Sequence, residues 1–288
     1  MVLEGKMVQE NIYMDGGLKQ ILNSIVYNVP NDWDSVILIS GSGMVRVGKS
    51  ILGQQIGYYM ANKLGTKFDI NNIVFSGSEL IKKSKDFPKY SVFVYDEARG
   101  ELDTKKVMEE ITRTLLDFFS ECGMYNHVVI LILPDFFELP KGIAINRSEL
   151  LLNVYRDRAN KKDKEGEDVI AFERGFFHGY HRQNKKKLYI IGKKNFNDYD
   201  IVKRDFLGRF LNIYTVDKEE YLAKKLQYLA RDRMKEVKDY KLNIVLKCLC
   251  NHISTRQAEE ELKLLGLKMD YSSISKHINK ITKEIESC

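Results

Sequence analysis

A glycine-rich loop that ends in Gly-Lys-Ser is the segment of this chain best suited to chemistry. Residues 43–50 read Gly-Met-Val-Arg-Val-Gly-Lys-Ser and fit the pattern G-x-x-x-x-G-K-S. Such a loop points backbone N–H groups at one spot, where a following helix adds the positive end of its dipole. Lys49 would then reach the β- and γ-phosphates of a nucleotide, and the Ser50 hydroxyl would hold Mg²⁺. The candidate phosphate-binding residues are Gly43, Met44, Val45, Arg46, Val47, Gly48, Lys49, Ser50 and Ile51.

An acidic pair follows a second apolar run. Residues 90–95 are typical of a buried strand, and Asp96 and Glu97 come directly after them. Because ligands of α/β folds bind at the carboxyl ends of strands, both carboxylates are expected beside the glycine-rich loop. Asp96 is the candidate second Mg²⁺ ligand, and Glu97 is the candidate base that deprotonates an attacking water. The alternative, an ordinary exposed acidic pair in a turn, is less favoured next to such a loop.

The elements around these motifs alternate between strand and helix. This alternation predicts an α/β fold in which a parallel sheet is flanked by helices. Apolar runs predict strands at 35–40, 72–76, 90–95, 128–133 and 150–155, and periodicity predicts helices at 18–26, 51–64, 78–83 and 105–120.

The two motifs together resemble those of P-loop ATPases that place a catalytic glutamate directly after the Walker B aspartate. That division includes the RecA-like motors, the FtsK/HerA-like DNA translocases and the zonular-occludens-toxin-like ATPases of phages. The resemblance covers about residues 33–155 and implies a P-loop NTPase core that binds ATP and Mg²⁺ and hydrolyses ATP. Such motors often carry Gln, Asn or Thr at the tip of the strand after Walker B, whereas this chain has Asp135 there.

Ring-shaped ATPases also use an arginine from a neighbouring subunit to neutralise charge on the γ-phosphate. Arg147 is the first candidate, because it follows a loop that is expected at the catalytic edge of the sheet. Arg113, on the helix after Walker B, is the second. With Lys49 and Glu97 they form the candidate catalytic set, although each arginine could simply pair with a surface acid.

Composition limits the possible classes of protein. A chain of 288 residues can bury one good core and a smaller domain, but not two full RecA-like domains with an accessory module. A second copy is therefore expected to complete the site in a homo-oligomer, such as a hexameric ring. The net charge of +6 permits nucleic acid binding without demanding it. With no membrane span, no secretory signal and no paired metal spacing among the four cysteines, a cytoplasmic protein with free thiols is expected.

A basic β-hairpin is predicted after the core. Residues 160–168 are charged and free of apolar side chains, which favours a mobile surface loop. A strand is predicted at 169–181, a turn at 183–187 and a return strand at 188–192. The tip lysines, Lys185, Lys186 and Lys187, would contact DNA phosphates. The alternative is an edge hairpin whose lysines prevent edge-to-edge pairing.

The C-terminal part is predicted to be helical throughout. A helix at 217–237 is followed by a short helix at 241–249, a helix at 255–264 capped by Ser254, and a third at 271–281. The last three resemble a helix-turn-helix module in which Lys276 and Asn279 contact DNA. The alternative is a three-helix module that binds protein or acts as a lid.

The sequence thus predicts a P-loop ATPase core with a hairpin extension and a small all-helical C-terminal module. The expected function is ATP hydrolysis coupled to the translocation or remodelling of double-stranded DNA, as in a motor of a phage or mobile element. The alternative is an ATP-dependent oligomerisation switch that binds DNA without translocation, as partition or transposition regulators do. The expected segments are a lead-in at 1–32, the core at 33–158, the extension at 159–215, a helical connector at 216–239 and the module at 240–288.

Overall fold

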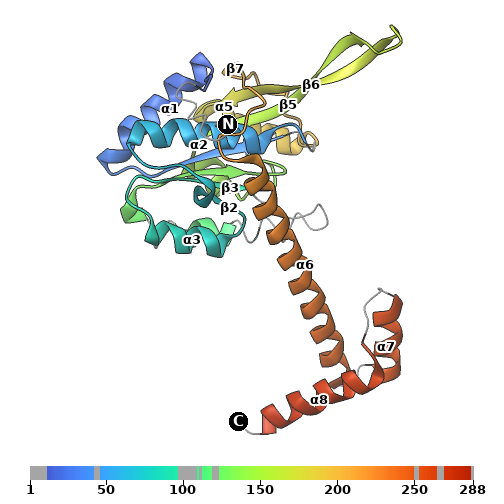
Figure 1. Cartoon of the computed structure of the whole chain (residues 1–288). Helices are drawn as coiled ribbons and strands as arrows, with labels where there is room; N and C mark the ends of the chain where they lie inside the picture. The colour runs from blue at the N-terminus through green and yellow to red at the C-terminus, as the bar shows by residue number, and fades with distance from the viewer. Residues whose placement is uncertain are drawn as a thin grey trace, which may run out of the picture. The chain divides into compact units, whose positions relative to one another are not determined.

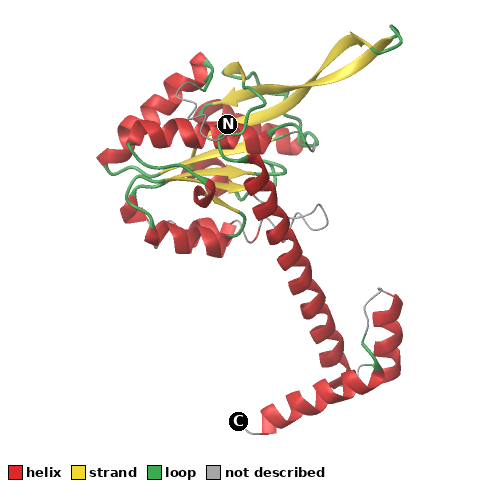
Figure 2. Ribbon diagram, in the orientation of Figure 1, coloured by secondary structure: helices red, strands yellow, loops and turns green. Residues whose placement is uncertain are grey.

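The protein is an α/β protein in which helices cover both faces of a single sheet (Figure 1). A computed structural model describes residues 12–41, 46–96, 109, 112–118, 123–249, 253–264 and 269–286. The chain divides into two compact units, Met1–Ala223 and Lys224–Cys288. The first unit contains all the strands (Figure 2), and the second is helical.

The sheet has seven strands in the order β2-β3-β4-β1-β5-β6-β7. The pairs from β2 to β5 are parallel, and β6 and β7 add to the sheet as antiparallel strands. The expected parallel core is therefore one part of a mixed sheet. The strands are β1 (Ser35–Ser40), β2 (Ile73–Val74), β3 (Val92–Asp96), β4 (Val128–Ile132), β5 (Ser148–Lys162), β6 (Asp168–Tyr180) and β7 (Phe206–Arg209).

Continuous apolar runs form the central strands because both faces of the sheet are covered. Every residue of β1, β3 and β4 is buried. One face packs on α1 (Gly16–Asn28) and α2 (Lys49–Leu64), and α2 approaches closely because it carries glycines. A Cβ added at Gly57 would lie 2.5 Å from the Phe68 ring, and one at Gly53 would lie 2.9 Å from Ile132.

The opposite face of the sheet carries the larger apolar cluster. Side chains of β1, β3, β4 and β5 pack there against α3 (Gly77–Asp86), the helical residues 112–118, a π-helical turn at Gly142–Arg147 and α5 (Arg182–Lys194). Short 3₁₀ turns lie at Val29–Asn31, Ile70–Asn72 and Gly123–Tyr125. The sheet is thus the middle layer of three.

The predicted elements of the core are confirmed where the structure describes them. The strand at 72–76 is shorter than predicted and the helix at 78–83 is longer. Of the predicted helix at 105–120, the described residues 109 and 112–118 are helical. Leu115 and Phe118 in this segment are buried, three residues apart on one face of the helix.

The hairpin lies in a different place from the one predicted. Strands β5 and β6 pair from Leu151↔Tyr180 out to Lys162↔Asp168, so the predicted mobile loop is the turn of a long hairpin. The Asp163 carboxylate accepts hydrogen bonds from the backbone N–H groups of Glu165 and Glu167 at 2.9 and 3.0 Å. Gly166 supplies a φ of 88° that glycine adopts without strain.

The predicted turn and return strand at 183–192 are wrong, because these residues belong to α5. Its buried residues are Lys185, Leu188, Tyr189 and Gly192, which recur at the three- and four-residue spacing of a helix face. The predicted extension at 159–215 is accordingly continuous with the core, since β6 and β7 belong to the same sheet.

In the second unit, three helical segments form a small core. The helix α6 (Lys218–Leu249) is continuous, so the predicted separate helices at 217–237 and 241–249 are one element. It is followed by α7 (Thr255–Leu264) and α8 (Tyr271–Glu286). Their shared buried side chains are Ile244, Val245, Cys248, Ala258, Leu262 and Ile274.

The predicted Ser254 cap at the start of α7 is confirmed, and with Gln257 it forms a capping box. The Ser254 hydroxyl accepts from the backbone N–H of Gln257 at 3.3 Å, and the Ser254 N–H donates to Gln257 Oε1 at 2.9 Å. Cys248 is a buried free thiol. Within the described residues, none of the helices has both the length and the apolar character that a membrane crossing requires.

Candidate functional site

The start of α2 has the features of an anion site as far as the structure describes them. Gly48 is the N-cap, with a left-handed φ of 106°, and Arg46 before it has a φ of 60°. No side chain caps the helix and its first turn contains no acid. The first N–H groups of α2 and the positive end of its dipole therefore remain suited to an anionic ligand. Gly43, Met44 and Val45 lie outside the described residues.

The Lys49 side chain runs along the carboxyl end of β1. Gly41 follows β1 directly, and a Cβ added to it would lie 3.4 Å from Lys49 Cδ and 2.9 Å from the carbonyl oxygen of Val154. Val47 is buried and would lie 3.2 Å from the same Cβ, so it anchors the loop to this end of the sheet. The close approach of Lys49, Val47 and Val154 thus requires glycine at position 41.

Asp96 ends β3 and is 2% exposed. Strand β4 lies between β3 and β1, and neighbouring strands are about 4.8 Å apart, so the ends of β1 and β3 are separated by about 10 Å. The first turn of α2 bridges this distance. The Tyr221 hydroxyl donates a hydrogen bond to Asp96 Oδ2 at 2.5 Å, and the Ser50 side chain interacts with the same hydroxyl and lowers its pKa.

Ser50 and Asp96, predicted as a Mg²⁺ pair, are therefore brought together around one atom. Burial, followed by the charge of Asp96, raises the pKa of Tyr221 well above its usual value, so the phenol keeps its proton and acts as the donor. Sequence reasoning did not identify Tyr221 as part of this site.

Tyr221 belongs to a segment that crosses the start of α2, residues 210–221, here called the strap. At its beginning, the Phe210 ring covers Gly48, where an added Cβ would lie 2.9 Å from Phe210 Cζ. The Phe210 N–H donates to the carbonyl oxygen of Gly175 at 2.8 Å. Gly175 has a φ of 102°, and an added Cβ there would lie 2.5 Å from the Phe210 carbonyl oxygen. Glycines on both sides thus allow the strap to lie against the loop.

Side chains of α2 bind the middle of the strap. The buried Gln55 donates from Nε2 to the carbonyl oxygens of Leu211 at 2.6 Å and Ile213 at 2.8 Å. Thr215 Oγ1 donates to the carbonyl oxygen of Gln54 at 3.2 Å. The strap is therefore held to α2 along its length.

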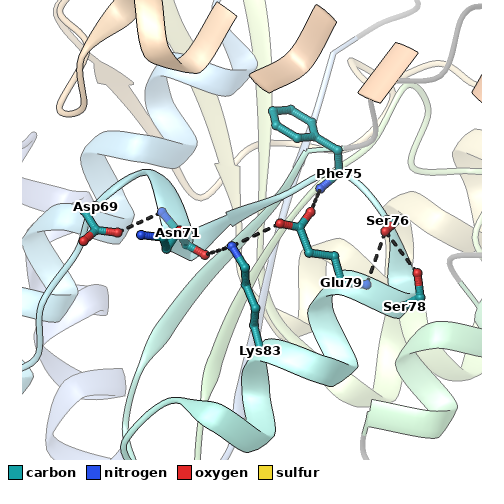
Figure 3. A network of polar contacts seen from close by, with 7 residues as sticks. All are labelled: Asp69, Asn71, Phe75, Ser76, Ser78, Glu79 and Lys83. Atoms are coloured by element: carbon teal, nitrogen blue, oxygen red, sulfur yellow. Dashed lines mark hydrogen bonds and ion pairs between the residues drawn. The ribbon is translucent and has the colours of Figure 1, made fainter. Parts of the chain in front are cut away.

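The end of the strap packs on Phe75, whose ring centroid lies 5.9 Å from that of Tyr221. A polar network fixes the turn after β2 that carries Phe75 (Figure 3). The Glu79 carboxylate accepts from the Phe75 N–H at 3.2 Å and forms an ion pair with Lys83 at 3.0 Å. Lys83 also donates to the carbonyl oxygen of Asn71 at 2.7 Å, and Ser76 caps α3 by accepting from the Glu79 N–H. Tyr221 thus rests on a fixed surface.

Arg147 does not lie at the predicted edge of the sheet. It ends the π-helical turn before β5, and the next residue, Ser148, pairs with Val36 at the start of β1. Arg147 is therefore at the amino edge of the parallel strands, whereas the loop follows their carboxyl ends. The chain returns from the carboxyl end of β4 at Ile132 to the amino end of β5 at Ser148, so Arg147 comes after this return and not before it. Arg113 is exposed on the helical residues 112–118.

Asp135, at the position where the related motors often carry Gln, Asn or Thr, accepts hydrogen bonds from nearby segments of the chain. Its carboxylate accepts from the Tyr199 hydroxyl at 3.0 Å, from Asn197 Nδ2 at 2.8 Å and from the Phe137 N–H at 3.0 Å. The Tyr199 hydroxyl also accepts from Ser40 Oγ at 3.1 Å, at the end of β1. Burial raises the pKa of Tyr199 well above its usual value. These bonds join the ends of β1 and β4 to the segment after α5.

The three predicted DNA-binding lysines differ in exposure. Lys186 and Lys187 are exposed on α5, but Lys185 is fully buried and donates to the Ser148 carbonyl and hydroxyl oxygens. Burial lowers the pKa of Lys185 to about 7. The prediction that Lys185 contacts phosphates from a hairpin tip is therefore wrong, because its ammonium is inside the protein.

The two residues predicted to contact DNA from the last helix are exposed. Lys276 and Asn279 are three residues apart on α8 and so share one face, while Ile274 is buried in the core of the second unit. Their role in binding DNA stays a prediction. The candidate base Glu97 lies outside the described residues.

Within the described part of the chain, no group of three or more histidine, cysteine or carboxylate side chains is placed to hold a metal. The oxygen donors of Ser50 and Asp96 nevertheless fit Mg²⁺, which usually takes one or two protein ligands and completes its shell with water and phosphate. The chain matches no protein-family model, and no curated protein is significantly similar to it.

Proposed function

We propose that this protein binds ATP with Mg²⁺ at the start of α2 and hydrolyses it. The observation that carries the proposal is that Ser50 and Asp96 meet at one atom, the Tyr221 hydroxyl, beside an uncapped helix N-terminus. The two residues come from different elements and lie in the two motifs that the sequence singles out. Their convergence is what a phosphate and Mg²⁺ site requires, and a chance glycine loop would not produce it.

In this proposal each residue has a separate role. Lys49 and the first N–H groups of α2 neutralise the phosphate oxygens. Ser50 and Asp96 would hold Mg²⁺, which when bound offsets the charge on the transferred phosphoryl group. Glu97 accepts a proton from the attacking water, since it follows the metal ligand directly.

Two substitutions test this assignment. Lys49→Ala should abolish binding of a fluorescent ATP analogue, because the positive charge on the phosphates is lost. Glu97→Gln should bind the analogue normally and lose a factor of about 100 or more in hydrolysis, because the base is gone. Lys63→Ala in the last turn of the same helix is the matched control and should resemble wild type. Normal hydrolysis by Glu97→Gln would remove Glu97 from the mechanism.

We further propose that a homo-oligomer couples hydrolysis to the translocation or remodelling of DNA. The exposed polar face of α8 with Lys276 and Asn279 and the net charge of +6 support this step. DNA should stimulate turnover, and Lys276→Ala with Asn279→Ala should weaken DNA binding. Lys263→Ala on the neighbouring α7 is the control for loss of charge alone. Turnover that is indifferent to DNA would argue against a motor.

The alternative function, an ATP-dependent oligomerisation switch, is favoured by one observation. The strap lies against the loop and bonds to Asp96, so nucleotide entry requires rearrangement of a segment that leads into α6. A switch should hydrolyse ATP slowly and change its mass in light scattering when ATP is added. A motor should instead turn over rapidly on DNA, which separates the two functions.

A further inference from the structure

The Tyr221 hydroxyl occupies the position between the two proposed Mg²⁺ ligands. It donates to Asp96 Oδ2 at 2.5 Å, and the Ser50 side chain interacts with it. A Mg²⁺ ion held by Ser50 and Asp96 would need the Asp96 oxygen, directly or through a bound water. The phenol hydrogen and the hydrated ion therefore compete for one carboxylate oxygen.

We infer that Tyr221 is a gate on the nucleotide site: its hydroxyl stands in for Mg²⁺ between Ser50 and Asp96, and Mg²⁺ with nucleotide must displace it. The inference rests on the proposed function, because it presupposes that these two residues hold Mg²⁺. It goes further in naming the group that regulates the site. It also explains why a tyrosine lies at the base of a helix whose first residues are otherwise charged.

The gate is not a single flexible side chain. The Tyr221 ring packs between Phe75, at 5.9 Å, and Tyr214, at 5.7 Å between ring centroids. Its N–H donates to the carbonyl oxygen of Asp217 at 3.0 Å, in the first turn of α6. Asp217 itself accepts from the Glu220 N–H at 2.7 Å and so caps the helix. Release of the hydroxyl consequently disturbs the strap and the start of α6 together.

The rest of the strap supports the same conclusion. The Phe210 ring lies against Gly48, and the Gln55 amide binds two strap carbonyl groups. These contacts hold the strap to the first two turns of α2, whose first N–H groups are the proposed phosphate ligands. A strap bound in this way reduces the apparent affinity for nucleotide by the fraction of molecules in which it is closed.

The gate gives the nucleotide a route to the rest of the chain. Tyr221 lies in the first unit, and α6 continues without a break from Lys218 to Leu249 in the second. A ligand shifts an equilibrium only through different affinities for the two states. Competition at Asp96 provides that difference, because the closed state bonds the phenol and the open state bonds the ion.

The test is to remove the hydroxyl and keep the ring. Tyr221→Phe should bind a fluorescent ATP analogue with Mg²⁺ about tenfold or more tightly than wild type, because it loses a hydrogen bond to a charged group that closes the site. Tyr214→Phe is the matched control, since its ring contacts Tyr221, and it should leave the affinity unchanged.

A second measurement uses the wild-type protein. Amide hydrogen exchange in residues 211–221 should become faster when Mg²⁺ and a non-hydrolysable ATP analogue are added, and should not change with Mg²⁺ alone. If wild type binds the nucleotide but Tyr221→Phe shows no gain and strap exchange stays the same, the gate is refuted while the proposed function stands. If neither protein binds nucleotide, the proposed function fails and the gate fails with it.

Discussion

Replacing the buried Lys185 should change how the stability of the first unit depends on pH. Its amine lies inside the protein against Ser148, and burial lowers its pKa from 10.5 to about 7. The folded chain therefore releases this proton near pH 7, whereas the unfolded chain keeps it until about pH 10.5. Between these values the unfolded state binds more protons, so the free energy of unfolding rises with pH.

The size of the effect follows from the two pKa values. Each unit of difference corresponds to about 1.4 kcal/mol, so the lowering from 10.5 to about 7 amounts to about 5 kcal/mol as an upper limit. From pH 7.5 to 9.5 the lysine alone should add roughly 2–3 kcal/mol to the free energy of unfolding. Below about pH 7 both states are protonated and its contribution is constant.

The experiment compares wild type with Lys185→Met in urea titrations between pH 6.5 and 9.5. Trp33, the single tryptophan, precedes β1 and reports on unfolding of the first unit. Lys185→Met should lose the rise with pH, because methionine keeps the volume and removes the amine. Its stability at one pH is less informative, since the Ser148 oxygens lose their donor at a cost of about 1–3 kcal/mol.

Lys186→Met is the matched control, because Lys186 is exposed on the same helix. Groups that titrate elsewhere contribute equally to all three proteins and cancel in the differences. Equal slopes for wild type and Lys185→Met would refute the reasoning and show that the amine finds water or a charge partner. A slope lost equally in the Lys186→Met protein would assign the effect to surface charge.

Three further substitutions test packing and polar contacts. Gly57→Ala should destabilise the first unit by about 1–3 kcal/mol in thermal unfolding, because the added Cβ would lie 2.5 Å from the Phe68 ring. Gly16→Ala is the control and should leave stability unchanged, because nothing lies within 4 Å of its added Cβ. Ser254→Ala should cost α7 about 1 kcal/mol through loss of its cap, seen as faster amide exchange in that helix, and unchanged exchange would contradict it. Tyr199→Phe should lower the free energy of unfolding in urea titrations by about 1–3 kcal/mol, because Asp135 and the Phe136 N–H lose a hydrogen-bond partner. Tyr27→Phe is the control and should have no effect, because Tyr27 is exposed.

The core of the fold could be predicted because its signals are local. An apolar run with a charged or glycine-containing end predicts a buried strand wherever it occurs, and β1, β3 and β4 all fit that description. The Ser254 cap is equally local, since its two hydrogen bonds join residues three apart. The convergence of Ser50 and Asp96 follows in turn from the carboxyl ends of parallel strands lying at one edge.

The errors occurred where local signals conflict. Residues 188–191 are Leu-Tyr-Ile-Ile, which favours a strand by composition, but the buried set of α5 follows helical spacing and includes a lysine. A charged residue at one of the buried positions of a helix obscures the regular spacing of its apolar residues. At residues 163–167 the charged composition suggested a mobile loop. Asp163 and Gly166, however, are residues that favour a turn, and they form a defined one.

The strap could not be predicted, because its contacts join distant parts of the chain. Tyr221 and Asp96 are 125 residues apart, and nothing near either residue indicates the other. One signal was available: a tyrosine follows Lys218, Glu219 and Glu220 in the first turn of a charged helix, and a buried ring there implies a docking surface.

The strap also gives the glycines of the loop a role that does not depend on phosphate binding. Gly48 needs its left-handed φ of 106° to start α2, and it also needs a missing side chain because Phe210 lies against it. Gly41 is required by the Val154 carbonyl oxygen in the same way. Packing alone therefore accounts for glycine at both positions. Phosphate binding has to be argued instead from Lys49, Ser50 and Asp96 near the start of α2, because these side chains supply the positive charge and the oxygen donors that a phosphate and Mg²⁺ require.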